Sequence, residues 1–150
     1  MPLMHDAVTL WTVRRLLLAL LLFGLIGTTS ELWLIGHHED VWQWAPLLVM
    51  TLSVAATAWV LAGWSSSALA VHRILMAVLL VTGVIGAVMH YRANMEFQLE
   101  MDPSLSGLAL MAEVLHAKAP PALAPGNMAL LALLGLVAGW RASYIRSSAS

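Results

Sequence analysis

Long runs of apolar residues alternate with short polar connections along this chain, and they predict membrane-spanning helices. A lipid hydrocarbon core about 30 Å thick requires roughly 20 apolar residues in a helix. Four segments fit this requirement, at 16–36, 45–64, 68–91 and 127–144. The sequence therefore predicts an all-α, polytopic membrane protein: a single transmembrane domain over residues 1–150, with four transmembrane helices arranged as two tandem hairpins.

The long connection at 92–126 predicts one further, short helix. Asp102 followed by Pro103 is typical of a helix start, because the carboxylate can cap the helix and proline is tolerated in its first turn. Apolar residues then recur at helical spacing, at Leu105, Leu108, Met111, Ala112 and Leu115. We expect a short amphipathic helix in this outer loop that lies on the membrane surface or covers the bundle.

Composition supports a lipid environment and excludes several functions. Hydrophobic residues make up 61% of the chain and charged residues only 10%, whereas soluble domains carry about 25% charged residues. The net charge of −1 provides no basic surface for nucleic acid. The chain contains no cysteine, so disulfides and thiolate metal sites are excluded. The pattern is similar to that of short inner-membrane proteins of bacteria, and it carries no motif of one particular family.

The distribution of basic residues predicts the orientation in the membrane. With four spans, Arg92 and Lys118 fall on one side, and the larger basic group falls on the other, at Arg14, Arg15, Arg73, Arg141 and Arg146. The side richer in arginine and lysine is normally cytoplasmic. We therefore expect a protein of the bacterial inner (plasma) membrane, with both termini in the cytoplasm and the main loop in the periplasm.

The two halves of the chain contain a possible internal repeat. When Arg14 is aligned with Arg73 at a constant offset, Gly24 meets Gly83, Gly27 meets Gly86, and Glu31 meets His90. One interpretation is a duplicated helical hairpin, related by an axis along the membrane normal; the other is chance similarity between leucine-rich helices. Small residues allow helices to approach closely, so Gly24, Gly27, Gly83 and Gly86 are predicted helix-packing positions that meet at the bundle axis.

Glu31 and His90 are the candidate chemical groups. An ionisable residue within the membrane is costly and normally faces a partner inside the protein, and the repeat places these two at similar depth. Three interpretations remain open: a structural pair that fixes helix register, a proton or quinone-headgroup site, and a site for a transition metal ion such as iron, zinc, manganese or copper. The predicted metal ligands are Glu31, His90, His38, His37 and Glu96. A haem would require His90 together with His37 or His38.

The function predicted from these features is non-enzymatic. The soluble segments are too short for a catalytic domain, whereas small-residue faces and seven tryptophans offer packing surfaces. We expect an accessory or structural subunit of a larger membrane complex, in contact with lipid and with other membrane subunits or further copies of itself. The alternative is a metal-binding or redox membrane protein that uses the Glu31 and His90 site.

Overall fold

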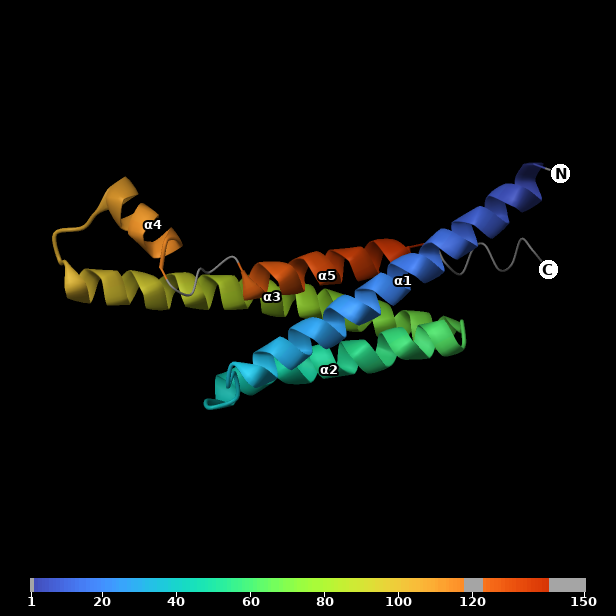
Figure 1. Ribbon diagram of the computed structural model, residues 1–150, viewed down its shortest axis with the longest axis horizontal. Coiled ribbons are helices and arrows are strands. Elements are labelled where there is room, and N and C mark those ends of the chain that lie inside the picture. The colour runs from blue at the N-terminus through green and yellow to red at the C-terminus, as the bar shows by residue number, and fades with distance from the viewer. Residues whose placement is uncertain (1, 118–122, 141–150) are drawn as a thin grey trace.

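Helices account for nearly all of the described chain. The computed structural model describes residues 2–117 and 123–140, with side chains from residue 8 onward. It contains no strand in these residues, which confirms the all-α prediction. The five helices are α1 (Pro2–Leu34), α2 (Val41–Ala62), α3 (Ser66–Met101), α4 (Gly107–Leu115) and α5 (Ala124–Gly139) (Figure 1).

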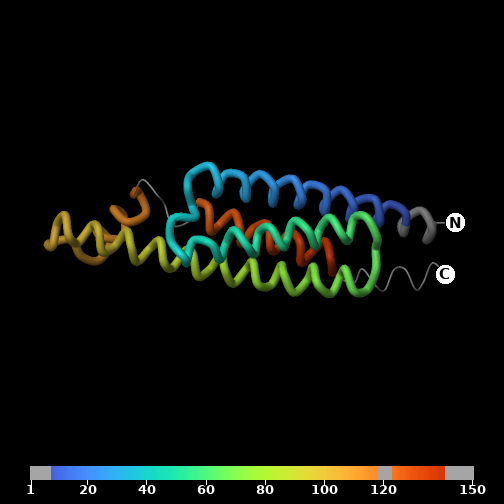
Figure 2. The backbone as a smooth tube through the Cα atoms, turned by 90° about the horizontal axis from the view of Figure 1, so that it is seen from below, coloured from blue at the N-terminus to red at the C-terminus, as the bar shows by residue number. Residues whose placement is uncertain are grey.

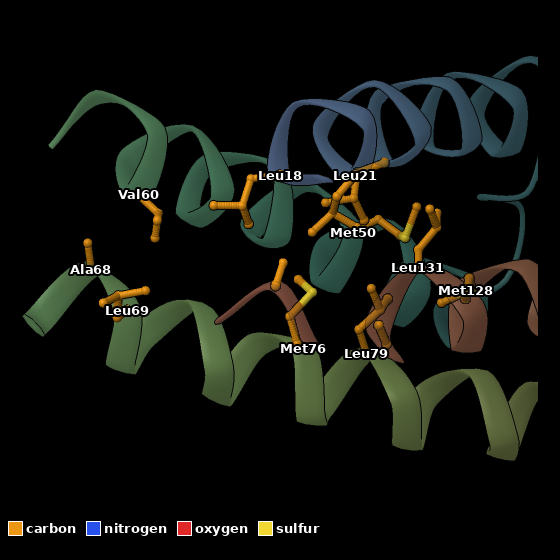
Figure 3. Close-up of a cluster of buried hydrophobic side chains, with 13 residues drawn as sticks. Leu18, Leu21, Met50, Val60, Ala68, Leu69, Met76, Leu79, Met128 and Leu131 are labelled. Atoms are coloured by element: carbon orange, nitrogen blue, oxygen red, sulfur yellow. The ribbon is translucent and has the colours of Figure 1, made fainter. Parts of the chain in front are cut away.

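Helices α1, α2, α3 and α5 form a bundle. Each is in contact with two neighbours, in the cyclic order α1, α2, α3, α5 and back to α1, and Figure 2 shows the four running alongside one another. Leucine and methionine fill the space between them. Leu21, Met50, Met76 and Leu79, which come from three of the helices, are fully buried together, and Figure 3 shows them pointing into one cluster.

The outside of the bundle is strongly apolar. Large hydrophobic side chains are exposed on every bundle helix, including Phe23 at 79%, Leu48 at 58%, Ile74 at 64% and Leu130 at 64%. Three helical segments are long and apolar enough to cross a membrane, at Val8–Leu34, Val41–Ala62 and Ser66–Met101, and a shorter apolar helix lies at Ala124–Gly139. The structure therefore supports a membrane protein with three long candidate spans and one shorter one.

Helix α3 is longer than the predicted span at 68–91, because it continues to Met101. Polar residues from Arg92 onward end the apolar run, but arginine, glutamate and glutamine favour helix as strongly as leucine does. At 36 residues, α3 is about 54 Å long, which exceeds the lipid core of about 30 Å. Figures 1 and 2 show its last turns extending beyond the loop between α1 and α2. We call residues 91–101 the projecting segment of α3.

The predicted helix start at Asp102 is wrong. Asp102 instead ends α3, and its Oδ1 accepts hydrogen bonds from the Ser104 amide at 2.9 Å and the Ser104 hydroxyl at 2.6 Å. The residue before a proline disfavours the helical conformation, so Pro103 stops the chain from continuing α3. The short helix α4 begins later, at Gly107. It packs on α3 through the fully buried Val114 and does not cover the bundle.

The remaining helix ends also differ from the apolar segments. Helix α1 begins at Pro2 rather than at residue 16, and α2 begins at Val41 rather than at residue 45. Helix α2 begins early because Asp40 and Gln43 form a capping box, in which the side chain of each residue accepts a hydrogen bond from the backbone N–H of the other. Helix α5 ends at Gly139; residues 141–144 of the predicted last span lie outside the described residues.

Candidate functional site

A buried polar cluster joins α2, α3 and α5 near the end of the bundle that holds the α2–α3 turn. Its centre is His72, which is completely buried. The His72 Nδ1 lies 3.3 Å from Thr57 Oγ1 of α2, and the His72 Nε2 lies 3.2 Å from the Gly135 carbonyl oxygen of α5. A carbonyl oxygen can only accept, so Nε2 carries the hydrogen. One imidazole therefore links three helices through hydrogen bonds.

The α2 side of this cluster contains two buried hydroxyls. The single hydrogen of the Thr57 hydroxyl is shared between two acceptors, His72 Nδ1 and the Ser53 carbonyl oxygen, which lies 2.7 Å away. The side chains of Thr57 and Ser53 are both fully buried. Within the described part of the chain, the Ser53 Oγ has no hydrogen-bond partner. An interhelical hydrogen bond inside an apolar bundle stabilises helix association by about 0.6 to 2 kcal/mol. The cluster therefore acts as a fixed connection between the two hairpins.

The sequence analysis did not identify this cluster, although a signal was present. Thr57 precedes Trp64 by seven residues, and His72 follows it by eight. Trp64 lies in the tight turn between α2 and α3, so residues equally distant from it in an antiparallel hairpin lie at the same depth. Two polar residues at matching depth in otherwise apolar helices are candidates for a hydrogen bond.

Arg73, the residue that follows His72, holds the C-terminal end of α5. Its Nε and Nη2 donate to the Gly139 carbonyl oxygen, at 3.0 Å and 2.6 Å. The last carbonyl oxygens of a helix have no partner within the helix and carry a partial negative charge. The Arg73 guanidinium supplies both the missing donors and the compensating positive charge. Together, His72 and Arg73 hold the last turn of α5 against α3.

Three of the four predicted packing glycines, Gly24, Gly83 and Gly86, lie at contacts with α5 rather than with each other. A Cβ built on Gly83 would lie 2.9 Å from the Pro125 carbonyl oxygen, and one on Gly86 would lie 3.4 Å from the Pro125 Cβ. On α1, a Cβ on Gly24 would lie 2.7 Å from Leu131 Cδ2, and one on Gly27 would meet nothing within 4 Å.

This arrangement bears on the proposed duplication. A two-fold exchange of hairpins converts α1 into α3 and α5 into α2, so it would place Gly83 against α2 if Gly24 lies against α5. Instead, both glycines lie against α5. The glycine contacts therefore do not follow the symmetry that the repeat predicts, and the duplication stays a prediction.

At the opposite end of the bundle, the structure brings two of the predicted ligands together. The His37 and His90 rings are stacked, with centroids 6.4 Å apart. Burial and the neighbouring His90 imidazole lower the pKa of His37. Glu31 is exposed on α1, and among the described residues no hydrogen bond or ion pair joins it to His90.

The other predicted ligands have separate surroundings. His38 stacks on Trp33 at 4.7 Å and meets Trp44 edge-on at 6.1 Å, and its buried Nδ1 has no partner in the described chain. Glu96 is exposed on the projecting segment of α3. Residues 8–117 and 123–140 contain no group of three or more His, Asp or Glu side chains arranged to hold a metal ion.

Comparison with protein-family models, with curated proteins and with solved structures finds no match to this chain.

Proposed function

We propose that this chain is a small integral membrane protein that crosses the bilayer four times and serves as a non-enzymatic accessory subunit of a larger membrane complex. Four spans require α5 to cross as well as the three longer helices. Its 16 residues are about 24 Å long, and a bilayer thins locally around a short span at modest cost. The exposed leucines and valines of α5 suit contact with lipid, for example Leu130 and Val137.

The ends of the bundle support one orientation. Arg14, Arg15 and Arg73 lie toward the end with the α2–α3 turn, whereas Glu39 and Asp40 lie in the loop at the other end. Basic residues favour the cytoplasmic side. The proposal therefore places the N-terminus and the α2–α3 turn in the cytoplasm, and the projecting segment of α3 with α4 on the outer side of a bacterial inner membrane.

A single observation carries the accessory role: the projecting segment of α3 exposes large apolar side chains beyond the end of the bundle. Phe97 is 57% exposed and Met101 is 71% exposed. On the outer surface along the bundle, exposed apolar residues face lipid in the proposed topology and need no further explanation. Outside it they face water, where apolar patches mark interaction sites. A partner that covers this segment would remove the patch from water.

Native mass spectrometry of the tagged protein, extracted from membranes in mild detergent, tests this role. The proposal predicts a companion protein at fixed stoichiometry, which is lost in a Phe97→Ser variant. The matched control is Phe23→Ser, which removes the same ring from a 79% exposed position on α1 and should leave the companion bound. A wild-type protein that appears only as a monomer, or only as multiples of itself, would contradict the accessory role.

A second candidate function, metal handling, is favoured by the stacked pair of His37 and His90. Imidazole nitrogens bind iron, zinc, copper and manganese, and ligands from a partner or from Glu31 would have to complete the site. Elemental analysis of the purified particle tests this function. Stoichiometric metal that is lost in His90→Ala and in His37→Ala would favour it, and metal that is unchanged in both variants would exclude this pair.

A further inference from the structure

One face of α3 runs without interruption from the core of the bundle onto the projecting segment. Its residues follow one another at intervals of three or four: Met76, Leu79, Gly83, Gly86, His90, Asn94, Phe97 and Met101. We call these residues the inner stripe of α3. Met76 and Leu79 are fully buried and Gly83 is buried, Gly86 and His90 are half-buried, and Phe97 and Met101 are exposed. The face that α5 and α2 cover inside the bundle therefore continues beyond them.

The stacked pair of His37 and His90 shows how far Phe97 and Met101 lie from the end of the bundle. His90 stacks on His37 of the α1–α2 loop, so it marks the level at which the other helices end. Phe97 lies seven residues beyond His90, or about 10 Å along the helix, and Met101 lies about 16 Å beyond it. The headgroup layer on each side of a bilayer is only about 5 to 8 Å thick. With His90 placed at the edge of the hydrocarbon core, Phe97 and Met101 lie beyond the headgroup layer, where an exposed apolar surface suits a protein partner.

The charges around this surface indicate the chemistry of that partner. Residues 92–117 hold one basic residue, Arg92, and four acidic residues, so their net charge is 1 − 4 = −3. All four acids are exposed: Glu96, Glu100, Asp102 and Glu113. Lys118, outside the described residues, changes the net charge of the whole segment 92–126 only to −2. The exposed Phe97 and Met101, with acids beside them, are complementary to an apolar face edged by lysine or arginine.

A second copy of the chain does not meet this requirement. Copies in one membrane share one orientation, so their acidic projecting segments would lie side by side and repel each other. The arginines Arg14, Arg15 and Arg73 lie toward the opposite end of the bundle. The complementary charge must therefore come from another protein.

We infer that a basic, amphipathic polypeptide segment of a partner protein docks along α3 between His90 and Met101 on the outer side of the membrane. This inference rests on the proposed accessory function and adds the chemistry of the partner. The docked segment lies in place of the helix that α5 provides further down, with its apolar side chains on Phe97 and Met101. Its basic side chains reach Glu96 and Glu100, which stand beside the stripe.

A defined peptide tests the inference without knowledge of the natural partner. The probe is a helical peptide of leucine and lysine, about 14 residues or four turns long, and the target is the full chain in nanodiscs of zwitterionic lipid. Saturable binding above that of empty nanodiscs supports the inference, provided that it weakens as salt is added. A peptide of the same pattern with glutamate in place of lysine should not bind.

Three variants locate the binding surface. Phe97→Ser should weaken binding about tenfold or more, as expected for a central aromatic contact. Glu96→Gln together with Glu100→Gln should weaken it about two- to tenfold, as expected for two charges at the rim. The matched control, Glu39→Gln, removes one exposed acid from the α1–α2 loop on the same side of the membrane and should leave binding unchanged.

Several results would overturn the inference. These are binding of the lysine peptide to empty nanodiscs with the same affinity, equal loss in the Glu39→Gln variant, or stronger binding of the glutamate peptide. If the lysine peptide fails to bind while native mass spectrometry still shows a companion lost in Phe97→Ser, the accessory role stands and the basic chemistry of the partner is refuted. If neither is seen, both proposals fail.

Discussion

Substitution of Gly83 by alanine provides a sensitive test of the contact between α3 and α5. The added Cβ would lie 2.9 Å from the Pro125 carbonyl oxygen and 3.1 Å from the Ala129 amide nitrogen. Carbon and oxygen atoms in close contact are usually about 3.3 to 3.6 Å apart. Both obstructing atoms belong to the backbone of α5, so no side-chain rotation can relieve the clash and the helix itself has to move.

The expected magnitude follows from two opposing effects. Overpacking of a tight contact costs about 1 to 3 kcal/mol, whereas alanine is favoured over glycine in a helix by about 1 kcal/mol. Gly27→Ala isolates the second effect, because a Cβ on Gly27 meets nothing within 4 Å. Relative to Gly27→Ala, the Gly83→Ala variant should lower the free energy of unfolding by about 1 to 3 kcal/mol.

Reversible unfolding in mixed detergent micelles, followed by circular dichroism, measures this difference. Two further glycines order the series. Gly24→Ala should be milder than Gly83→Ala, because only the flexible end of Leu131 obstructs it, and Gly86→Ala adds only an ordinary contact at 3.4 Å. If Gly83→Ala is as stable as Gly27→Ala, the close approach of α3 and α5 is refuted.

Three other predictions concern the polar contacts of the bundle. Thr57→Val should lower the free energy of unfolding by about 1 to 3 kcal/mol, because it leaves His72 Nδ1 unpaired. The control is Thr51→Val, which removes only a hydroxyl bond to the Leu47 carbonyl oxygen. It should change the free energy of unfolding by less than about 0.5 kcal/mol. Arg73→Gln should destabilise the protein by about 1 kcal/mol through loss of charge at the end of α5, and equal effects of Arg73→Gln and of the exposed Arg15→Gln would contradict this role. Burial and the neighbouring His90 lower the pKa of His37. The contribution of His37 to stability is therefore present above its unfolded pKa of about 6.5 and is lost as the pH falls through the lower folded pKa. His37→Gln should flatten the decline of the melting temperature in acid, and an unchanged decline would refute the lowered pKa of His37.

Much of the architecture follows from local physical chemistry. Apolar runs of about 20 residues predict helices whatever the tertiary contacts are, so the sequence locates the helices of the bundle. Their ends depend on weaker signals. Asp40 and Gln43 begin α2 before its apolar run starts, and polar helix formers extend α3 beyond its apolar run to Met101.

The candidate sites were harder to predict, because they depend on which helix lies beside which. The sequence offset pairs Glu31 with His90, whereas the neighbour of His90 that the structure shows is His37, from the α1–α2 loop. The relevant information, the cyclic order of the four helices, is not contained in the pattern of any single helix. His72 illustrates the opposite case: its distance from the α2–α3 turn matches that of Thr57, so hairpin geometry alone would have indicated their contact.

The same order of helices explains why the predicted meeting of glycines at the bundle axis is not seen. Neighbours in the ring approach more closely than helices on the diagonal, and α1 and α3 are on a diagonal. Gly24 and Gly83 therefore provide space for α5, which is the neighbour of both helices.

The membrane topology is the claim on which the accessory role and the docking surface both depend. The chain has no cysteine, so single introduced cysteines can be labelled without background. We predict that Ser104→Cys, in the loop after α3, reacts with a membrane-impermeant maleimide in intact spheroplasts, and that Ser67→Cys, at the start of α3, reacts only after the membrane is broken. Labelling of both positions from the same side of an intact membrane would contradict the account.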